Sequence, residues 1–177
     1  MTDYIATYRL QFRPAFGFAD AAGIVPYLAA LGISHIYASP IFRARPGSPH
    51  GYDGVDPNDL NPELGAAAAW EDLVRRRRAA GLGWLQDIVP NHMAFHADNG
   101  LLTDIFEHGP ASRYHGFFDI DWHHPSEDLA GRVMAPFLGR RYRECLQNGD
   151  IRVFFDAEGF AALVYDEMRF PLAVGSY

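Results

Sequence analysis

The sequence contains one cysteine, Cys145, and no long hydrophobic run. A lone cysteine cannot form an intramolecular disulfide, which favours a reducing compartment. No stretch approaches the roughly 18 apolar residues of a membrane span, and Met1–Leu10 lacks the basic and apolar regions of a signal peptide. We therefore expect a cytoplasmic protein with no membrane partner.

Basic residues are also scarce, because 15 Lys and Arg face 22 Asp and Glu and the net charge is −7. This balance argues against a nucleic-acid partner, since phosphate binding depends on concentrated positive charge. The one basic run, Arg75–Arg78, ends a predicted helix, where it complements the helix dipole and is expected to face water. Hydrophobic residues make up 49% of the 177 positions, enough for a sizeable core in one domain or a little more.

The first half of the chain alternates between strand and helix patterns. The hydrophobic periodicity predicts, in order, a strand at 5–10, a helix at 18–31, a strand at 33–38, a helix at 66–80 and a strand at 83–89. Pro26 is expected to kink the first helix or to mark its start. Right-handed connections between such elements predict an α/β fold, a parallel sheet covered by helices.

The third predicted strand ends in a cluster of polar residues. Its near-continuous hydrophobicity indicates a strand buried on both faces, which Pro90 terminates. Asp87, Asn91 and His92 then gather at the carboxyl end, where ligands bind in parallel α/β folds. Hydrogen bonding within the fold is the alternative explanation for such residues.

Residues 39–62 form a long predicted loop rich in proline and glycine. Loops of this length in compact domains are usually functional or disordered, and the segment His-Gly-Tyr-Asp-Gly-Val-Asp at 50–56 favours function.

After His92 the pattern becomes irregular. It predicts helices at 99–106 and 140–147, and a hairpin of 152–155 with 160–165 turned at 157–159; residues 169–173 carry no pattern of a closing strand. A complete β/α barrel needs about 250 residues. We therefore expect either an open sheet or, preferably, a barrel fragment: residues 1–92 as its first units, then residues 93–177 as an inserted, irregular α+β subdomain.

Two motifs carry a resemblance to a known family. Asp-Ile-Val-Pro-Asn-His at 87–92 and His-Gly-Tyr-Asp at 50–53 resemble the α-amylase family of barrel enzymes, glycoside hydrolase family thirteen. The fold that this resemblance implies is a partial (β/α)8 TIM barrel with its first three strands and two helices. Further similar stretches are at 7–11, 37–42, 48–53 and 117–122.

Those further stretches narrow the resemblance to the branch that transfers a glucosyl group within one molecule. Its enzymes turn the reducing-end α-1,4 linkage of a maltooligosaccharide into an α,α-1,1 (trehalose) linkage. The similarity covers residues 4–177 but only the front portion of the family's enzyme. The implied substrate is a maltooligosaccharide or a glycogen-derived glucan.

The resemblance also implies roles for single residues. His92 is similar to the histidine that hydrogen-bonds the sugar at the cleavage subsite, and Tyr52 to the aromatic that stacks on the same ring. Asp87 matches an aspartate that braces the site. His50 and Asp53 belong to the same substrate-binding motif as Tyr52, although turn formation explains Asp53 equally well.

Asn91 matches a position that binds structural calcium in many α-amylases. We count it among the substrate-binding candidates and assign no metal and no cofactor. The family's nucleophile and general acid come from the fourth and fifth barrel strands, and no residue up to Tyr177 matches them. The resemblance thus implies an isomerase whose catalytic carboxylates lie beyond this chain, which alone is expected to be inactive.

Three other functions stay open. The chain could be a non-catalytic maltooligosaccharide-binding module with Tyr52, Trp84, Trp122 and His92 as its platform. It could belong to another hydrolase or glucanotransferase of the same family. A metal-dependent hydrolase using Asp87, His92 and His96 is disfavoured, because no His-Glu-x-x-His pattern accompanies them.

Overall fold

A computed structural model describes residues 3–155, 161–165 and 168–176. The chain divides into two compact units, Met1–Ala94 and Phe95–Tyr177, which we describe one at a time. Among the described residues, no helix combines the length and the apolar character that a bilayer span requires.

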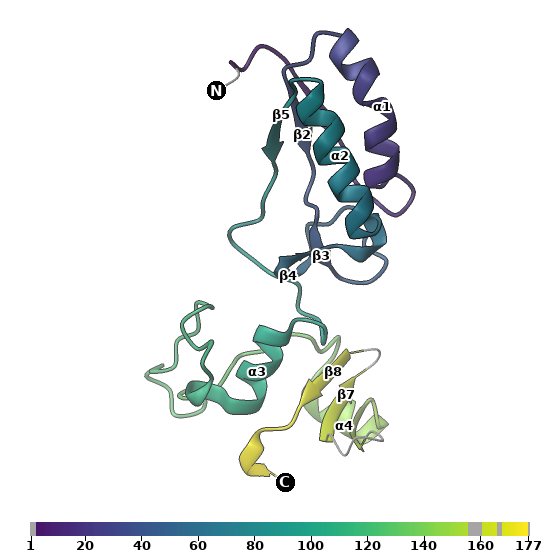
Figure 1. Ribbon diagram of the computed structural model, residues 1–177. Coiled ribbons are helices and arrows are strands. Elements are labelled where there is room, and N and C mark those ends of the chain that lie inside the picture. Colours follow the sequence, from purple (N-terminus) through teal and green to yellow (C-terminus); the bar gives the residue numbers. More distant parts are fainter. Residues whose placement is uncertain (1–2, 156–160, 166–167, 177) are drawn as a thin grey trace. The chain divides into compact units, whose positions relative to one another are not determined.

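The first unit is an α/β unit built on a parallel sheet. The sheet has the order β1-β2-β5, and Thr7, His35 and Gly83 stand side by side at the start of the three strands. Two helices, α1 and α2, lie together on one face of the sheet (Figure 1). The bounds are β1 Thr7–Leu10, α1 Phe18–Ala30, β2 His35–Ala38, α2 Ala67–Ala79 and β5 Gly83–Gln86. The predicted strand and helix order of this half is confirmed.

The core of this unit lies between the helices and the sheet. Phe18 and Leu28 of α1, Leu73 of α2 and Ile36 of β2 are fully buried there. Burial of each such side chain stabilises the fold by about 1.5–3 kcal/mol relative to its exposed state. Pro26 lies inside α1, which runs continuously from Phe18 to Ala30 and does not start at the proline.

The prediction that 39–62 is a loop without strands was wrong. This segment contains β3 (Phe42–Ala44) and β4 (Gly54–Leu60), which pair as an antiparallel hairpin, and the 3-10 helix Pro62–Leu64. The pairing register of the hairpin shifts immediately before and immediately after Arg43, and Pro57 lies within β4. These irregularities break the alternation by which a strand is recognised in a sequence.

The third strand also differs from its prediction. It ends at Gln86 and not at Val89, and Pro90 is not what ends it. The amide of Asp87 makes one further bond to the carbonyl of Ala38, 2.9 Å away, and β2 ends at that residue. With no partner strand beyond, the chain leaves the sheet, and the side chain of Ile88 is 60% exposed.

The second unit combines helices with a small antiparallel sheet of order β6-β7-β8. Its interior is aromatic: the rings of Phe137 and Phe170 stack at 4.3 Å, and Phe95 and Phe106 pack against Phe170. The bounds are α3 Gly100–His108, α4 Tyr142–Asn148, β6 Ile151–Phe155, β7 Ala161–Tyr165 and β8 Met168–Pro171, with 3-10 helices at Gly109–Ala111 and Val174–Ser176.

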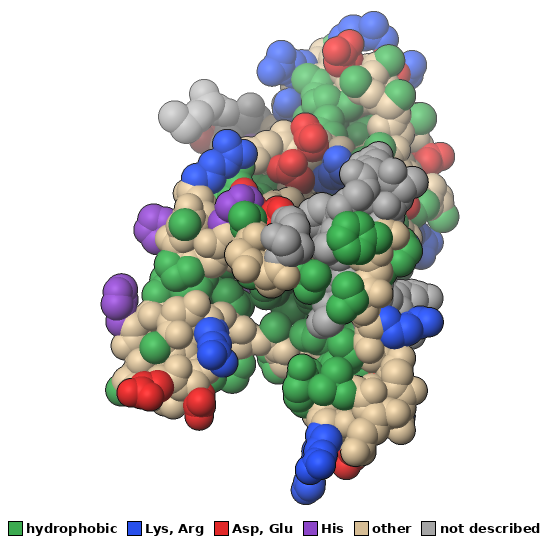
Figure 2. Space-filling model, turned by 90° about the horizontal axis from the view of Figure 1, so that it is seen from below, with side chains coloured by type: hydrophobic (Ala, Val, Ile, Leu, Met, Phe, Trp, Pro, Cys, Tyr) green, Lys and Arg blue, Asp and Glu red, His purple; other side chains and the backbone are tan. Residues whose placement is uncertain are grey.

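Two predictions for this unit have different outcomes. The predicted antiparallel pairing of β6 with β7 is observed, while the predicted turn at 157–159 lies outside the described residues. The expectation that 169–173 holds no closing strand was wrong, because β8 pairs with β7. Hydrophobic side chains remain on the molecular surface (Figure 2), and Phe117 and Met134 are 70% and 75% exposed.

Candidate functional site

The site lies on the face of the parallel sheet opposite to the helices. Side chains alternate along a strand, so the in-register residues Arg9, Tyr37 and Leu85 share this face, and Asp87 follows Leu85 by two positions. The helix-covered face instead carries the core residues Leu10 and Ile36 and the ring of Trp84. The sheet therefore separates an apolar core from a partly polar face.

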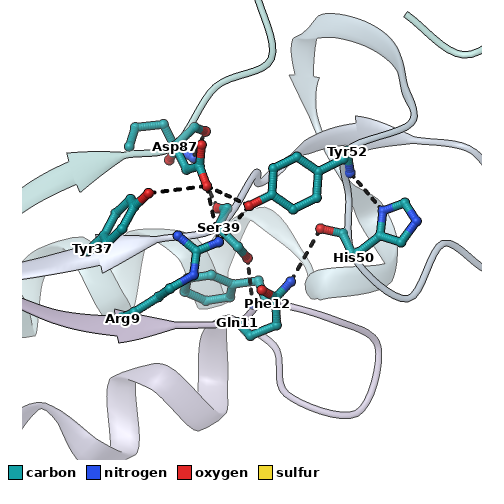
Figure 3. Close-up of polar contacts among 9 residues, drawn as sticks. Arg9, Gln11, Phe12, Tyr37, Ser39, His50, Tyr52 and Asp87 are labelled. Atoms are coloured by element: carbon teal, nitrogen blue, oxygen red, sulfur yellow. Dashed lines mark hydrogen bonds and ion pairs between the residues drawn. The ribbon is translucent and has the colours of Figure 1, made fainter.

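Asp87 is the centre of the polar contacts on this face (Figure 3). Its Oδ2 accepts hydrogen bonds from the Tyr52 hydroxyl at 2.6 Å and from Arg9 Nη2 at 3.1 Å. The Tyr37 hydroxyl lies 3.5 Å from the same oxygen. Arg9 Nη2 also donates to the Tyr52 hydroxyl at 2.6 Å, so the three groups form a closed triangle. One carboxylate thereby joins β1, the end of β5 and the segment that precedes β4.

This arrangement shifts the ionisation of its members. The hydrogen bond from Tyr52, followed by the bond from Arg9 and its charge, lowers the pKa of Asp87 against the opposing effect of burial. The hydrogen bond to Asp87 and burial raise the pKa of Tyr52. Burial opposes the charge on Arg9, but its bonds to Asp87 and Tyr52 outweigh burial and raise its pKa. At neutral pH the site thus holds a carboxylate, a neutral phenol and a guanidinium.

The segment 48–53 that carries Tyr52 is held by its own polar groups. The Ser48 hydroxyl donates to Asp53 and accepts from the Gly51 amide at 3.0 Å. Arg45 Nε lies 3.6 Å from the other carboxylate oxygen of Asp53. Gly51 has a φ of +77°, and a β-carbon there would crowd the Pro40 carbonyl. In the structure Asp53 stabilises the loop; its substrate-binding role stays a prediction.

His50 accepts the backbone N–H of Tyr52 at its Nδ1, 3.0 Å away. An Nδ1 that accepts a hydrogen bond carries no proton, so the neutral imidazole carries its proton on Nε2. The side chain is 49% exposed, and Nε2 has no bond to a described residue. His50 can therefore donate a hydrogen bond to a hydroxyl of a ligand.

A pocket of about 260 Å³ lies beside Asp87. Its lining comes from the β3–β4 hairpin and from the segment after β5, and it is mostly apolar. The titratable side chains in this lining are Asp56, Asp87 and His92. Asp56, in β4, accepts the backbone amide of Asn58 at its Oδ1, 2.8 Å away.

Asp87 and His92 line the pocket; Tyr52 is not part of the lining but is hydrogen-bonded to Asp87. Asn91 is exposed and is not part of the lining. Trp84 cannot serve as a sugar platform, because its ring packs against Phe12 and Trp70 on the helix-covered face. Trp122 and His96 belong to the second unit.

Arg9, Gln11 and Tyr37 belong to the site but were not predicted from the sequence. An arginine in the middle of a short strand was the available signal, since a charge inside a sheet needs a partner. The expectation that all of Arg75–Arg78 faces water was also wrong. Arg77 is half-buried with its guanidinium 5.8 Å from the Trp84 ring centre, and burial, with the neighbouring Arg78, lowers its pKa.

In the described part of the chain, no group of three or more His, Cys, Asp or Glu side chains is placed to hold a metal ion. His96, named in the metal-hydrolase alternative, lies with its Nδ1 3.8 Å from Asp98 Oδ2 and accepts the Asp98 amide.

Comparison with known proteins gives the family. The sequence profile described as "Alpha amylase, catalytic domain" matches residues 16–144. The chain belongs to this α-amylase family. A Mycobacterium tuberculosis protein named as a maltooligosyl trehalose synthase is 42% identical to the chain over 142 residues, which is 76% of the chain and 18% of that protein.

Solved structures of this α-amylase-family fold agree with the sequence match. The maltooligosyltrehalose synthase of Arthrobacter ramosus superposes with a TM-score of 0.82 at 38% identity, over 97% of this chain and 21% of that one. Another maltooligosyl trehalose synthase superposes with a TM-score of 0.86 at 35% identity, over 97% and 22%. The chain thus spans about one fifth of the length of these relatives.

Proposed function

We propose that residues 1–177 are the first part of a maltooligosyltrehalose synthase, with residues 1–92 as its first three barrel strands and two helices and 93–177 as an inserted subdomain. The reaction is intramolecular: the reducing-end α-1,4 linkage of a maltooligosaccharide becomes an α,α-1,1 linkage. The observation that carries this proposal is the hydrogen bond of Tyr52 to Asp87, a residue that lines the same pocket as His92. The similarity to the named synthases supports it.

In this function each side chain has a defined task. The Tyr52 ring offers an apolar face on which a pyranose stacks, and His92 and His50 donate hydrogen bonds to sugar hydroxyls. Asp87 holds Tyr52 and Arg9 in place. Because its pKa is lowered, Asp87 stays ionised and cannot be the general acid, which needs a raised pKa. The nucleophile and general acid belong to the rest of the enzyme.

The count of reducing ends tests the reaction type. The product of the complete gene is incubated with maltopentaose, and reducing sugar is measured over time. The synthase removes a reducing end with each turnover, so reducing sugar falls while total sugar stays constant. A hydrolase of the same family raises it, and a glucanotransferase changes chain lengths but not the number of ends. A rise or a constant value contradicts the proposal.

A non-catalytic glucan-binding module is the second candidate, because all lining residues of the pocket lie within Met1–Ala94. Titration of the 177-residue chain with maltopentaose separates the two ideas. Binding without any change of sugar by the complete gene product supports the module. Binding together with loss of reducing ends supports the synthase.

A further inference from the structure

Arg9 of β1 and Gln11, which directly follows β1, hold the segment that presents Tyr52. Arg9 Nη2 bonds the Tyr52 hydroxyl at 2.6 Å, and Gln11 Nε2 donates to the carbonyl of His50 at 3.3 Å. Gln11 follows Arg9 by two positions in the chain. Figure 3 shows both side chains reaching from β1 and the residue after it toward the 50–52 segment. The end of β1 thus contacts this segment at its ring and at its backbone.

Arg9 is itself held in place. Its guanidinium lies 4.5 Å from the centre of the Tyr37 ring and bonds Asp87 Oδ2 at 3.1 Å. A guanidinium is planar and rigid, and stacking on an aromatic face fixes its plane. The donor that meets the Tyr52 hydroxyl therefore has a defined direction, set by β1 and β2.

The Tyr52 hydroxyl is both a hydrogen-bond donor and a hydrogen-bond acceptor here. It donates a hydrogen bond to Asp87 and accepts one from Arg9, so two partners in different directions fix the position of the oxygen. With Asp87 alone, the ring could swing about that single bond. Fixing a side chain before binding lowers the entropy that a ligand must remove.

We propose that Arg9 is a positioning residue that fixes the plane of the Tyr52 ring for stacking on a glucose unit, acting through the phenolic hydroxyl. This inference rests on the proposed function for its ligand, a maltooligosaccharide. Arg9 itself is not assigned a contact with the sugar.

The charges around Tyr52 give this role a specific signature. Asp87 disfavours ionisation of the phenol, Arg9 favours it, and Tyr37 and His50 are the other titratable groups at hand. Removal of Arg9 leaves the Asp87 bond and takes away the positive neighbour. Tyr52 should then ionise at a higher pH than in the unchanged chain.

The test compares Arg9→Met, Arg9→Lys and the control Arg13→Met in the 177-residue chain. Arg13 is exposed and its side chain contacts no described titratable group. Tyrosine labelled with ¹³C at Cζ reports each phenol by NMR, and the spectrum of Tyr52→Phe identifies the Tyr52 signal. Binding of maltopentaose is measured by titration on the same samples.

We expect Arg9→Met to move the Tyr52 titration to higher pH and to weaken maltopentaose binding about tenfold, the loss typical of one charge-assisted hydrogen bond. Arg9→Lys should show a smaller shift of the Tyr52 titration and a smaller loss of affinity than Arg9→Met, and Arg13→Met should change neither quantity. If Arg9→Met does not fold, Arg9→Lys against Arg13→Met still decides, because a lysine cannot reproduce the planar stacking on Tyr37.

An unchanged Tyr52 titration in Arg9→Met overturns the inference, even if affinity falls, since Arg9 would then act on the sugar without Tyr52. A shifted titration with unchanged affinity overturns it too. If the unchanged chain and the complete gene product both fail to bind maltopentaose, the proposed function fails. The Tyr52 titration still reports separately whether Arg9 holds the ring.

Discussion

The hydroxyl of Tyr52 donates a 2.6 Å hydrogen bond to Oδ2 of Asp87, across a separation of 35 residues in the sequence. This bond connects the loop before β4 with the residue that follows β5. It also links two properties of the site, because the same contact that orients the ring keeps the carboxylate ionised.

The first prediction concerns Asp87→Asn and the pH dependence of stability. The folded pKa of Asp87 lies below the ordinary value of 3.8, so its ionised form stabilises the fold at any pH above that value. As pH falls through the folded pKa, this contribution is lost. The unfolding free energy of the unchanged chain should exceed that of Asp87→Asn at neutral pH, and the difference should shrink below about pH 4.

Urea denaturation at a series of pH values measures this difference. Asp59→Asn is the matched control, because Asp59 is exposed in β4 and its carboxylate forms no hydrogen bond or ion pair with a described residue. A constant difference between the unchanged chain and Asp87→Asn from pH 7 to pH 3 would contradict the assigned role of the Tyr52 and Arg9 hydrogen bonds.

The second prediction separates the ring of Tyr52 from its hydroxyl. Tyr52→Phe keeps the stacking face but loses both hydrogen bonds, and should weaken maltopentaose binding about as much as loss of Arg9, about tenfold. Tyr52→Ala removes the ring as well and should weaken binding further. In the double variant with Arg9→Met, Tyr52→Phe should add little, since both changes break one contact. Additive losses would show that the two residues act separately.

The sequence predicted those parts of the fold that depend on local periodicity. The order of β1, α1, β2, α2 and β5 follows from apolar spacing, and the tertiary structure does not override it. The β3–β4 hairpin was missed because its register shifts and Pro57 hide the alternation. β8 was missed because the two residues that separate it from β7 in the sequence, Asp-Glu, lack the glycine on which the prediction of the first hairpin rested.

The sequence indicated several of the residues that belong to the candidate site, but not which of them contact one another. Asp87 and His92 were picked out from their place after a strand, and both line the pocket. No local pattern could show that Arg9 bonds residues 43 and 78 positions away. Trp84 was proposed as a platform because sequence alone does not tell which face of an isolated strand is covered by helices.

The third prediction is the tautomer of His50. Since Nδ1 accepts the Tyr52 amide, the neutral ring should carry its proton on Nε2. The ¹⁵N shifts of the imidazole distinguish the two tautomers directly. His92, which makes no bond to a described residue, is the internal control and should show a mixture closer to that of a free imidazole. A protonated Nδ1 in neutral His50 would rule out the hydrogen bond.

The last prediction concerns the packing of Gly83 against His35, which stand side by side on β5 and β2. His35 is buried; its Nδ1 is 3.1 Å from the Ser34 hydroxyl, and its ring stacks on Tyr4 at 4.1 Å. A β-carbon on Gly83 would overlap the imidazole, so Gly83→Ala forces the ring out of its stack and should destabilise the fold by about 1–3 kcal/mol.

The matched control for Gly83→Ala is Gly23→Ala, an exposed position inside α1 with open space around the added carbon. That change should stabilise the fold by about 0.5–1 kcal/mol, because alanine favours a helix over glycine. Thermal unfolding of both variants measures the two opposite shifts. The Gly83→Ala loss should also be smaller in a His35→Ala background, where the clash is absent. An equal loss in both backgrounds would mean that His35 is not what requires glycine at position 83.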